Sequence, residues 1–185
     1  MIITEKKCIE RDVFKNLRKK SSSTELFNVG INVKNYVDSI SNNSLENKHI
    51  GIYWPLENEV DLRSLRDKYS LALPRCEKNK SLLFCLWDEK ELTKDKQGIL
   101  APDSSKKLSY EQISIIFIPC LSIDKNLIRL GYGGGYFDKL RQDKYWYSIP
   151  CIGILTSECI SPDLLTRAEW DIPLSGFITD KEILV

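Results

Sequence analysis

The sequence of 185 residues contains one histidine and no cysteine pair spaced C-x-x-C. A metal site built from several histidines is therefore excluded, and so are zinc-ribbon and thioredoxin-type motifs. The longest uninterrupted apolar run has six residues, 82–87, whereas a membrane-spanning helix needs about 20. The net charge is only +1, which gives no general reason to expect nucleic acid or a membrane surface as a partner.

Glycine and proline are also scarce, with 9 and 7 residues, which excludes collagen-like and low-complexity chains. A chain of this length and 42% hydrophobic content buries a core without disulfides, so we expect one domain over residues 1–185. Three of the six cysteines, Cys85, Cys120 and Cys151, lie in apolar runs and are predicted to be buried thiols. The N-terminus turns charged before any apolar run forms, so a secretory signal is not expected and the cytoplasm is the predicted location. We also expect a monomer.

Two helices are predicted at the start of the chain. The first covers residues 5–20, where apolar residues at helical spacing indicate one apolar face: Ile9, Val13 and Leu17. The second opens at Ser22, because Glu25 completes a capping box three residues later, and it ends in the Ser/Asn-rich stretch 41–44.

Short apolar segments dominate the rest of the chain. Predicted strands cover residues 49–54, 71–73, 82–87, 113–118, 151–155 and 176–179, and three of them are expected to stop at Pro55, Pro74 and Pro119. Helical or irregular segments separate them, and residues 88–112 are the most loop-like. This pattern favours an α/β fold with an open, mainly parallel, doubly wound (Rossmann-like) sheet and helices on both faces.

The informative segment follows the predicted strand 113–118. Arg129 precedes four glycines within five residues, and residues 136–141 are predicted to be helical. Glycines allow consecutive N–H groups to turn toward one anion, and the following helix adds the positive end of its dipole. Arg129 is suited to clamp a phosphate with its planar guanidinium, and Asp138 is suited to hold a metal ion bound to that phosphate.

This glycine segment fits neither of two common nucleotide-binding motifs. No Lys-Ser/Thr pair follows the last glycine, as a P-loop requires, and Tyr136 stands where the third glycine of G-x-G-x-x-G belongs. A tight structural turn remains an alternative interpretation of the glycines, and a first-turn carboxylate serving only the helix dipole remains one for Asp138.

Residues 129–138, RLGYGGGYFD, closely resemble the signature of the 5-formyltetrahydrofolate cyclo-ligase family. Four further segments resemble family elements in the same order along the chain: residues 15–18, 54–61, 73–75 and 169–173. The sequence departs from the family pattern at Leu62, where threonine is usual, and at Ala101, where glutamate is common before proline. Phe14 stands where some members carry a basic residue.

The resemblance implies an enzyme that uses ATP as co-substrate and Mg²⁺ to convert 5-formyltetrahydrofolate into 5,10-methenyltetrahydrofolate. ATP would phosphorylate the formyl oxygen, and N10 would then attack the formyl carbon. The implied partners are these small molecules, and neither nucleic acid nor a membrane is expected.

The resemblance also implies roles for individual residues. Arg129 and Tyr136 would be catalytic, and Asp138 and Asp171 would hold Mg²⁺. ATP would contact Lys15, Arg18, Arg129, Leu130, Gly131, Tyr132, Gly133, Gly134, Gly135, Tyr136 and Phe137. The folate would contact Trp54, Glu59, Tyr132, Gly133, Gly134, Gly135 and Tyr136, with Glu59 accepting hydrogen bonds from the pterin.

Each role has a structural alternative. Lys15 and Arg18 could form a solvated helix face, Glu59 could cap the helix predicted from Val60, Trp54 could belong to the core, and Asp171 could open a turn. Two other functions stay open: a sugar-phosphate isomerase or CoA-transferase-like enzyme of similar fold, and a non-catalytic nucleotide- or folate-binding module. Turnover that depends on ATP and Mg²⁺ separates the cyclo-ligase from both.

Overall fold

The fold was analysed in a computed structural model that describes residues 2–45, 48–88 and 90–185. Its α-helices are α1 (Ile3–Arg18), α2 (Ser23–Ser44) and α3 (Tyr136–Gln142). The main strands are β1 (His49–Gly51), β2 (Leu71–Cys76), β3 (Leu82–Leu86), β6 (Ile113–Pro119), β9 (Cys151–Ile154), β10 (Gly176–Ile178) and β11 (Ile183–Leu184). Two small hairpins are β4 (Thr93–Lys94) with β5 (Leu100–Ala101), and β7 (Ser122–Ile123) with β8 (Arg129–Leu130). Short 3₁₀ helices are η1 (Arg63–Asp67), η2 (Lys78–Lys80), η3 (Ser104–Lys106), η4 (Tyr110–Gln112), η5 (Trp146–Ser148) and η6 (Ser157–Cys159).

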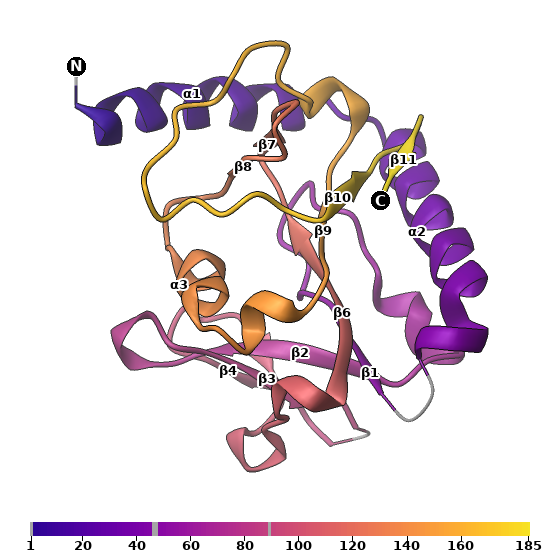
Figure 1. Ribbon diagram of the computed structural model, residues 1–185. Coiled ribbons are helices and arrows are strands. Elements are labelled where there is room, and N and C mark those ends of the chain that lie inside the picture. The colour runs from indigo at the N-terminus through magenta and orange to yellow at the C-terminus, as the bar shows by residue number, and fades with distance from the viewer. Residues whose placement is uncertain (1, 46–47, 89) are drawn as a thin grey trace.

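The central sheet has seven strands in the order β11-β10-β9-β6-β1-β2-β3 (Figure 1). The inner neighbours from β10 to β2 pair in parallel, whereas both edge strands, β3 and β11, pair antiparallel. The predicted α/β fold with a mainly parallel sheet is therefore confirmed. The carboxyl ends of the parallel strands lie at one edge, where such folds bind ligands.

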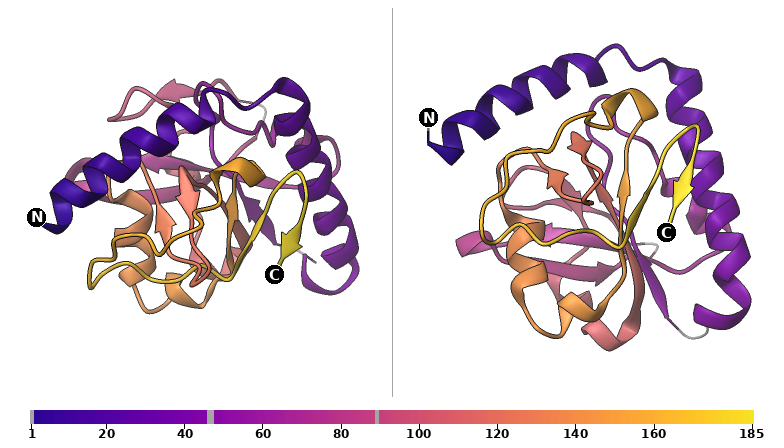
Figure 2. Two further views of the ribbon diagram at one scale, coloured as in Figure 1. Left: turned by 90° about the horizontal axis from the view of Figure 1, so that it is seen from above. Right: turned by 45° about the horizontal axis from the view of Figure 1, so that its top comes forward.

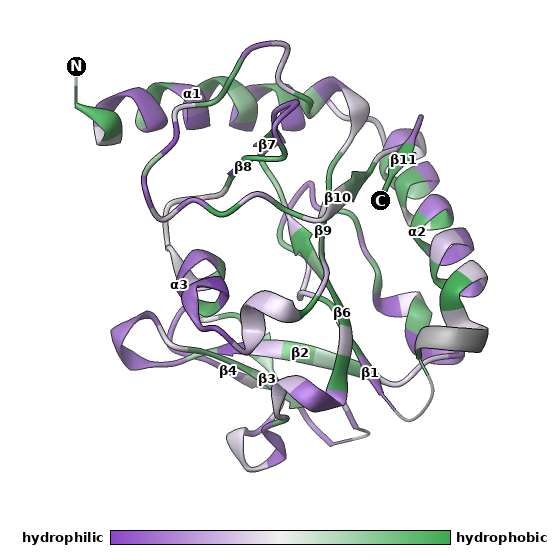
Figure 3. Ribbon diagram, viewed as in Figure 1, coloured by the Kyte–Doolittle hydropathy of each residue, from purple (hydrophilic) through white to green (hydrophobic). Residues whose placement is uncertain are grey.

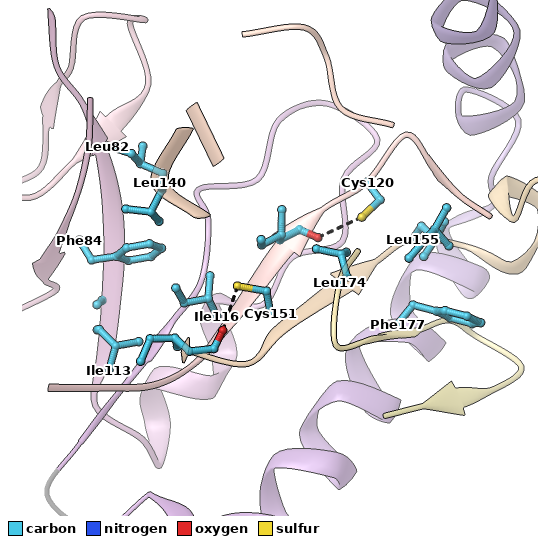
Figure 4. Packing of buried hydrophobic residues seen from close by; sticks show 14 of the residues in the cluster. Leu82, Phe84, Ile113, Ile116, Cys120, Leu140, Cys151, Leu155, Leu174 and Phe177 are labelled. Carbon is cyan, nitrogen blue, oxygen red and sulfur yellow. Dashed lines mark hydrogen bonds between the residues drawn. The ribbon is translucent and has the colours of Figure 1, made fainter. Parts of the chain in front are cut away.

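Helices cover both faces of this sheet, as predicted. Strand β6 shows why: Ile115 and Phe117 pack on one face, and Ile116 and Ile118 on the other. On the first face, α2 contributes the fully buried Val29, Val33 and Val37, after starting at the predicted capping box of Ser22 and Glu25. On the second face, Leu140 of α3 packs beside the strand residues Leu82 and Phe84 (Figure 4), and Trp146 of η5 packs against the same cluster. Figure 3 shows hydrophobic residues concentrated on the central strands.

The cysteine prediction is confirmed. Cys85, Cys120 and Cys151 are fully or almost fully buried, and all six cysteines are free. The thiol of Cys120 donates to the carbonyl of Ile118 at 3.5 Å, and that of Cys151 donates to the carbonyl of Ile149 at 3.4 Å (Figure 4). These cysteines are therefore part of the core.

The predicted apolar face of α1 is wrong for Ile9 and Val13, whereas Leu17 packs against the core as predicted. Ile9 and Val13 are 55% and 51% exposed, whereas Phe14 and Arg18 are 7% exposed. Helix α1 lies across one end of the sheet, beside the β7–β8 hairpin (Figures 1 and 2). Loops at that end present carbonyls and carboxylates, so α1 turns basic side chains toward them and only part of its apolar surface inward.

Two local predictions also need correction. Strand β2 continues through Pro74, because its pairing with β1 ends at Ala72 and the missing N–H of Pro74 then costs no hydrogen bond on that side. The loop-like stretch 88–112 contains the β4–β5 hairpin and short 3₁₀ turns. Among the described residues, no helix is long and apolar enough to cross a membrane.

Candidate active site

The glycine segment links β8 to α3 at the carboxyl edge of the sheet. Gly133 and Gly135 have φ of +99° and +73°, a region that side chains other than glycine rarely adopt. Gly135 is also the N-cap of α3, which begins at Tyr136 as predicted. The chain therefore needs glycine here to turn sharply from strand to helix, and the turn leaves backbone N–H groups at a helix start.

Two cavities flank this segment and share Arg129, Gly133, Gly135 and Asp138. The larger cavity, of about 450 Å³, is lined mainly by apolar and aromatic residues together with Glu59. The smaller one, of about 290 Å³, is lined by four cationic side chains, Lys7, Arg11, Lys80 and Arg129, and by two carboxylates, Asp138 and Asp171. An apolar compartment thus meets a cationic compartment at the glycine segment.

Arg129 and Asp138 form an ion pair at this junction, with Nη2 and Oδ1 2.9 Å apart. Arg129 also donates from Nη1 to the carbonyl of Pro119 at 3.2 Å. Burial opposes the charge on both side chains, yet Asp138 raises the pKa of Arg129 and Arg129 lowers the pKa of Asp138. The pair is therefore ionised and holds the end of β6 against the start of α3.

Glu59 lines the larger cavity and is 7% exposed. Its Oε2 accepts a hydrogen bond from the Leu56 N–H at 2.8 Å, and its Oε1 lies 3.1 Å from Nη2 of Arg18. That second contact lacks hydrogen-bond geometry and leaves Oε1 unsatisfied, so it is an ion pair only. Burial raises the pKa of Glu59, and Arg18 partly offsets this. The cap alternative is wrong, since η1 begins at Arg63 with Leu62 as its N-cap.

Trp54 is half-buried: it lines the same cavity and also packs against the hydrophobic core. Its ring packs edge-on against Trp87 with centroids 6.0 Å apart, and the guanidinium of Arg63 lies 4.6 Å from the Trp54 centroid. These contacts fix the plane of the indole, so the cavity has one rigid aromatic wall.

The predicted tyrosines and their neighbours also lie at the cavities. Tyr132, Tyr136 and Phe137 line the larger cavity, and Leu130 lines the smaller one. The hydroxyl of Tyr136 accepts a hydrogen bond from Nε2 of Gln97 at 2.8 Å. Gln97 comes from the β4–β5 hairpin. The sequence pattern predicts an irregular loop there, so it does not identify Gln97 as a site residue.

The basic residues of α1 are distributed differently from the prediction. Lys15 is 3.8 Å from Asp12 with its side chain 43% exposed, and it lines neither cavity. Lys7 and Arg11 line the cationic cavity instead, and Nε of Arg11 donates to the Gly131 carbonyl at 2.9 Å. The sequence did not point to Lys7 or Arg11 as site residues, because the apolar spacing predicted that Ile9 and Val13 lie on the buried face of α1.

The two carboxylates predicted to hold Mg²⁺ share the cationic cavity. Asp171 forms an ion pair with Lys7 and accepts from the Ala168 N–H at 2.6 Å. In residues 2–45, 48–88 and 90–185, no three or more His, Cys, Asp or Glu side chains are grouped to hold a metal ion. Mg²⁺ is commonly held by one or two carboxylates together with substrate phosphates and water. Asp138 and Asp171 fit that donor set.

The space around Gly131 is too small for a side chain. A Cβ at this position would lie 2.7 Å from Nη1 of Arg129. We expect Gly131→Ala to displace the guanidinium from Asp138 and to lower kcat about 10-fold or more, because small misplacements of catalytic groups are costly. The control is Gly30→Ala on α2, where the nearest atom is 3.8 Å away. Equal steady-state kinetics for both variants would contradict the tight packing.

The fold and the candidate site together define an α/β protein in which an apolar cavity and a cationic cavity meet at a glycine segment. A family model described as the 5-formyltetrahydrofolate cyclo-ligase family matches residues 3–180. The chain therefore belongs to the 5-formyltetrahydrofolate cyclo-ligase family, and the prediction of such an enzyme is confirmed.

Individual relatives agree with this assignment. A 5-formyltetrahydrofolate cyclo-ligase from Haemophilus influenzae is 26% identical over 137 residues, which cover 69% of this chain and 73% of that protein. One from Escherichia coli K12 is 28% identical over 106 residues, covering 56% and 58%. The 5,10-methenyltetrahydrofolate synthetase structure from Aquifex aeolicus has a TM-score of 0.78 at 24% identity and covers 96% of this chain and 91% of its own. The Mycoplasma pneumoniae synthetase structure has a TM-score of 0.70 at 21% identity, covering 94% and 98%. At these identities the two structures support the fold.

Proposed function

We propose that the enzyme closes 5-formyltetrahydrofolate to 5,10-methenyltetrahydrofolate with ATP and Mg²⁺, releasing ADP and phosphate. The observation that carries this proposal is the junction of two unlike cavities at one glycine segment. The apolar cavity suits a pterin, and the cationic cavity suits a triphosphate. The shared residues lie where the formyl oxygen and the γ-phosphate must meet.

The chemistry needs an activated leaving group, because a formamide oxygen leaves poorly. The formyl oxygen attacks the γ-phosphorus, and the bond from that phosphorus to ADP breaks. N10 then attacks the formyl carbon and loses its proton, and the C–O bond to phosphate breaks as the ring closes. Positioning of two ligands and neutralisation of the moving phosphoryl group supply most of the catalysis in such transfers.

The side chains of the cationic cavity suit that task. Lys7, Arg11 and Arg129 would neutralise phosphate oxygens, and the N–H groups of the glycine segment would bind them directly. Mg²⁺, held by Asp138 and Asp171, would supply further positive charge to the phosphates. Lys7 and Arg11 thus take the part that the resemblance gave to Lys15, and Lys80 adds a fourth cation from η2.

The larger cavity would hold the folate. Ionised Glu59 would accept N–H groups of the pterin, and Trp54 would contact its flat face. Tyr132 and Tyr136 would lie between pterin and phosphate. Tyr136 accepts from Gln97, so its own hydroxyl proton is free to be donated to an oxygen of either ligand.

The direct test is the ultraviolet absorbance of methenyltetrahydrofolate. We expect it to appear when the enzyme, 5-formyltetrahydrofolate, ATP and Mg²⁺ are mixed, and to vanish when either ATP or Mg²⁺ is left out. Product without ATP would contradict the proposal. Binding of both ligands without turnover would favour a non-catalytic binding module.

Three further predictions concern the whole protein: a single domain over residues 1–185, a monomer, and a cytoplasmic location. Light scattering of the purified enzyme at micromolar concentration checks the second. A mass of twice 21.4 kDa would contradict it.

A further inference from the structure

Arg18 lies at the end of α1 and is 7% exposed. All three of its nitrogens have partners within the protein. Nε donates to the Asn58 carbonyl at 2.8 Å, Nη1 donates to the Tyr132 hydroxyl at 2.7 Å, and Nη2 lies 3.1 Å from Oε1 of Glu59. Two of the five N–H groups thus make hydrogen bonds within the protein, and Nη2 faces the Glu59 carboxylate, so the guanidinium is held by protein groups at the folate side of the site.

The position of Arg18 agrees with its contacts. It lines neither the apolar nor the cationic cavity, whereas its partners Glu59 and Tyr132 both line the apolar one. Arg18 therefore lies behind two residues that line the apolar cavity and is not itself part of the lining. The phosphate role that the resemblance gave to Arg18 requires a side chain that reaches the cationic cavity.

We propose that Arg18 is a positioning residue of the folate pocket, which holds the Glu59 carboxyl in place and fixes the hydroxyl of Tyr132. This inference rests on the proposed function. It assigns Arg18 to substrate recognition instead of nucleotide binding.

The charge balance around Glu59 explains the need for Arg18. Tyr53, Tyr132 and Cys120 also face this region, and burial raises the pKa of each, that of Cys120 to about 11, so all three stay neutral. Of the described groups facing Glu59, Arg18 supplies the positive charge. Burial alone would favour the protonated carboxyl, which accepts pterin N–H groups less well than a carboxylate.

Tyr132 is the second cavity residue that Arg18 contacts. Its oxygen accepts from Arg18, so its single proton is directed elsewhere. The guanidinium of Arg18 also lies 5.5 Å from the centroid of the Tyr132 ring. One buried cation thus orients a carboxylate from the loop after β1 and a tyrosine from the glycine segment.

Replacing Arg18 with methionine tests the assignment, with Lys19→Met as the matched control. Lys19 is the exposed next residue and loses the same charge. We expect Arg18→Met to raise the folate KM about 10- to 100-fold, the equivalent of one or two charge-assisted hydrogen bonds. The ATP affinity, measured by calorimetry without folate, should stay within about twofold of wild type. Lys19→Met should match wild type in both measurements.

The pH profile separates positioning from general damage. Folate kcat/KM should fall as the pH drops through the pKa of Glu59, and Arg18→Met should move that acid limb to higher pH, because the positive charge that lowers this pKa is gone. Arg18→Lys keeps the charge and should return the limb toward its wild-type position. The lysine cannot reach three acceptors at once, so the folate KM should recover only in part.

Two results would overturn the inference. One is weaker ATP binding by Arg18→Met with an unchanged folate KM, which is the behaviour of a phosphate ligand. The other is an acid limb that stays in place. Should Arg18→Met fail to fold by circular dichroism, Arg18→Lys decides alone, since a phosphate ligand would still show its loss in ATP affinity. Wild-type enzyme without ATP-dependent turnover would instead reject the proposed function.

Discussion

Asp138→Asn should lower kcat by about 10²- to 10³-fold, the usual cost of removing one group that stabilises developing charge. The substitution keeps the size of the side chain and removes the carboxylate charge that would hold Mg²⁺ in the cationic cavity. Asp67→Asn, on exposed η1, serves as the control. The measurement is kcat over a wide range of Mg²⁺ concentration, and near-wild-type turnover throughout that range would remove Asp138 from the metal site.

The same variant should also lose stability. Asp138 is the ion-pair partner of Arg129, whose side chain is 9% exposed. The Asp138 side chain is 32% exposed, so solvent screens the pair, and its loss should cost about 1–2 kcal/mol rather than the roughly 3–5 kcal/mol of a fully buried pair. Chemical denaturation of the variant and of Asp67→Asn measures it. An unchanged free energy of unfolding would mean that Arg129 finds another partner.

Glu59→Gln should raise the folate KM about 10- to 100-fold, because hydrogen bonds to a charged group contribute about 1.5–3 kcal/mol each. Glutamine keeps one acceptor oxygen but turns an NH₂ group toward pterin donors. ATP affinity should be unchanged, since Glu59 does not line the cationic cavity. The acid limb of folate kcat/KM should also disappear, because no carboxyl is left to protonate.

Glu57→Gln is the matched control for this variant, since Glu57 is exposed two residues away. Steady-state kinetics with folate, ATP calorimetry and a pH profile are measured for both variants. If Glu59→Gln keeps the wild-type folate KM, Glu59 leaves the site and pterin recognition passes to the aromatic wall. If it keeps the acid limb, another group controls that limb.

Much of the fold could be predicted from local sequence signals. The capping box at Ser22 and the apolar run of β6 specify their elements through nearby residues alone, and both predictions are confirmed. The edge strands could not be oriented in this way. Strand β3 is as apolar as the parallel strands, yet it pairs antiparallel with β2 because the connection between the two strands is short. The hydrophobic pattern of a strand does not encode its direction, so it could not predict this pairing.

The residues of the candidate site likewise fall into two groups, those that local sequence predicts and those that only tertiary packing decides. The sequence alone determined the glycine segment with Arg129 before it and Asp138 after it, because the turn needs glycine at Gly133 and Gly135 and all these residues are neighbours along the chain. Only the tertiary structure decided which cations face the ligands. Lys7, Arg11, Lys15 and Arg18 follow one another on α1 at intervals of four, four and three residues, so their spacing places all four on one face of the helix. The rotation of α1 is set by the burial of Phe14 among apolar residues of the β7–β8 region and by hydrogen bonds from Arg11 and Arg18 to loop carbonyls. That rotation brings Lys7 and Arg11 to the cationic cavity, leaves Lys15 outside it, and buries Arg18 against Glu59.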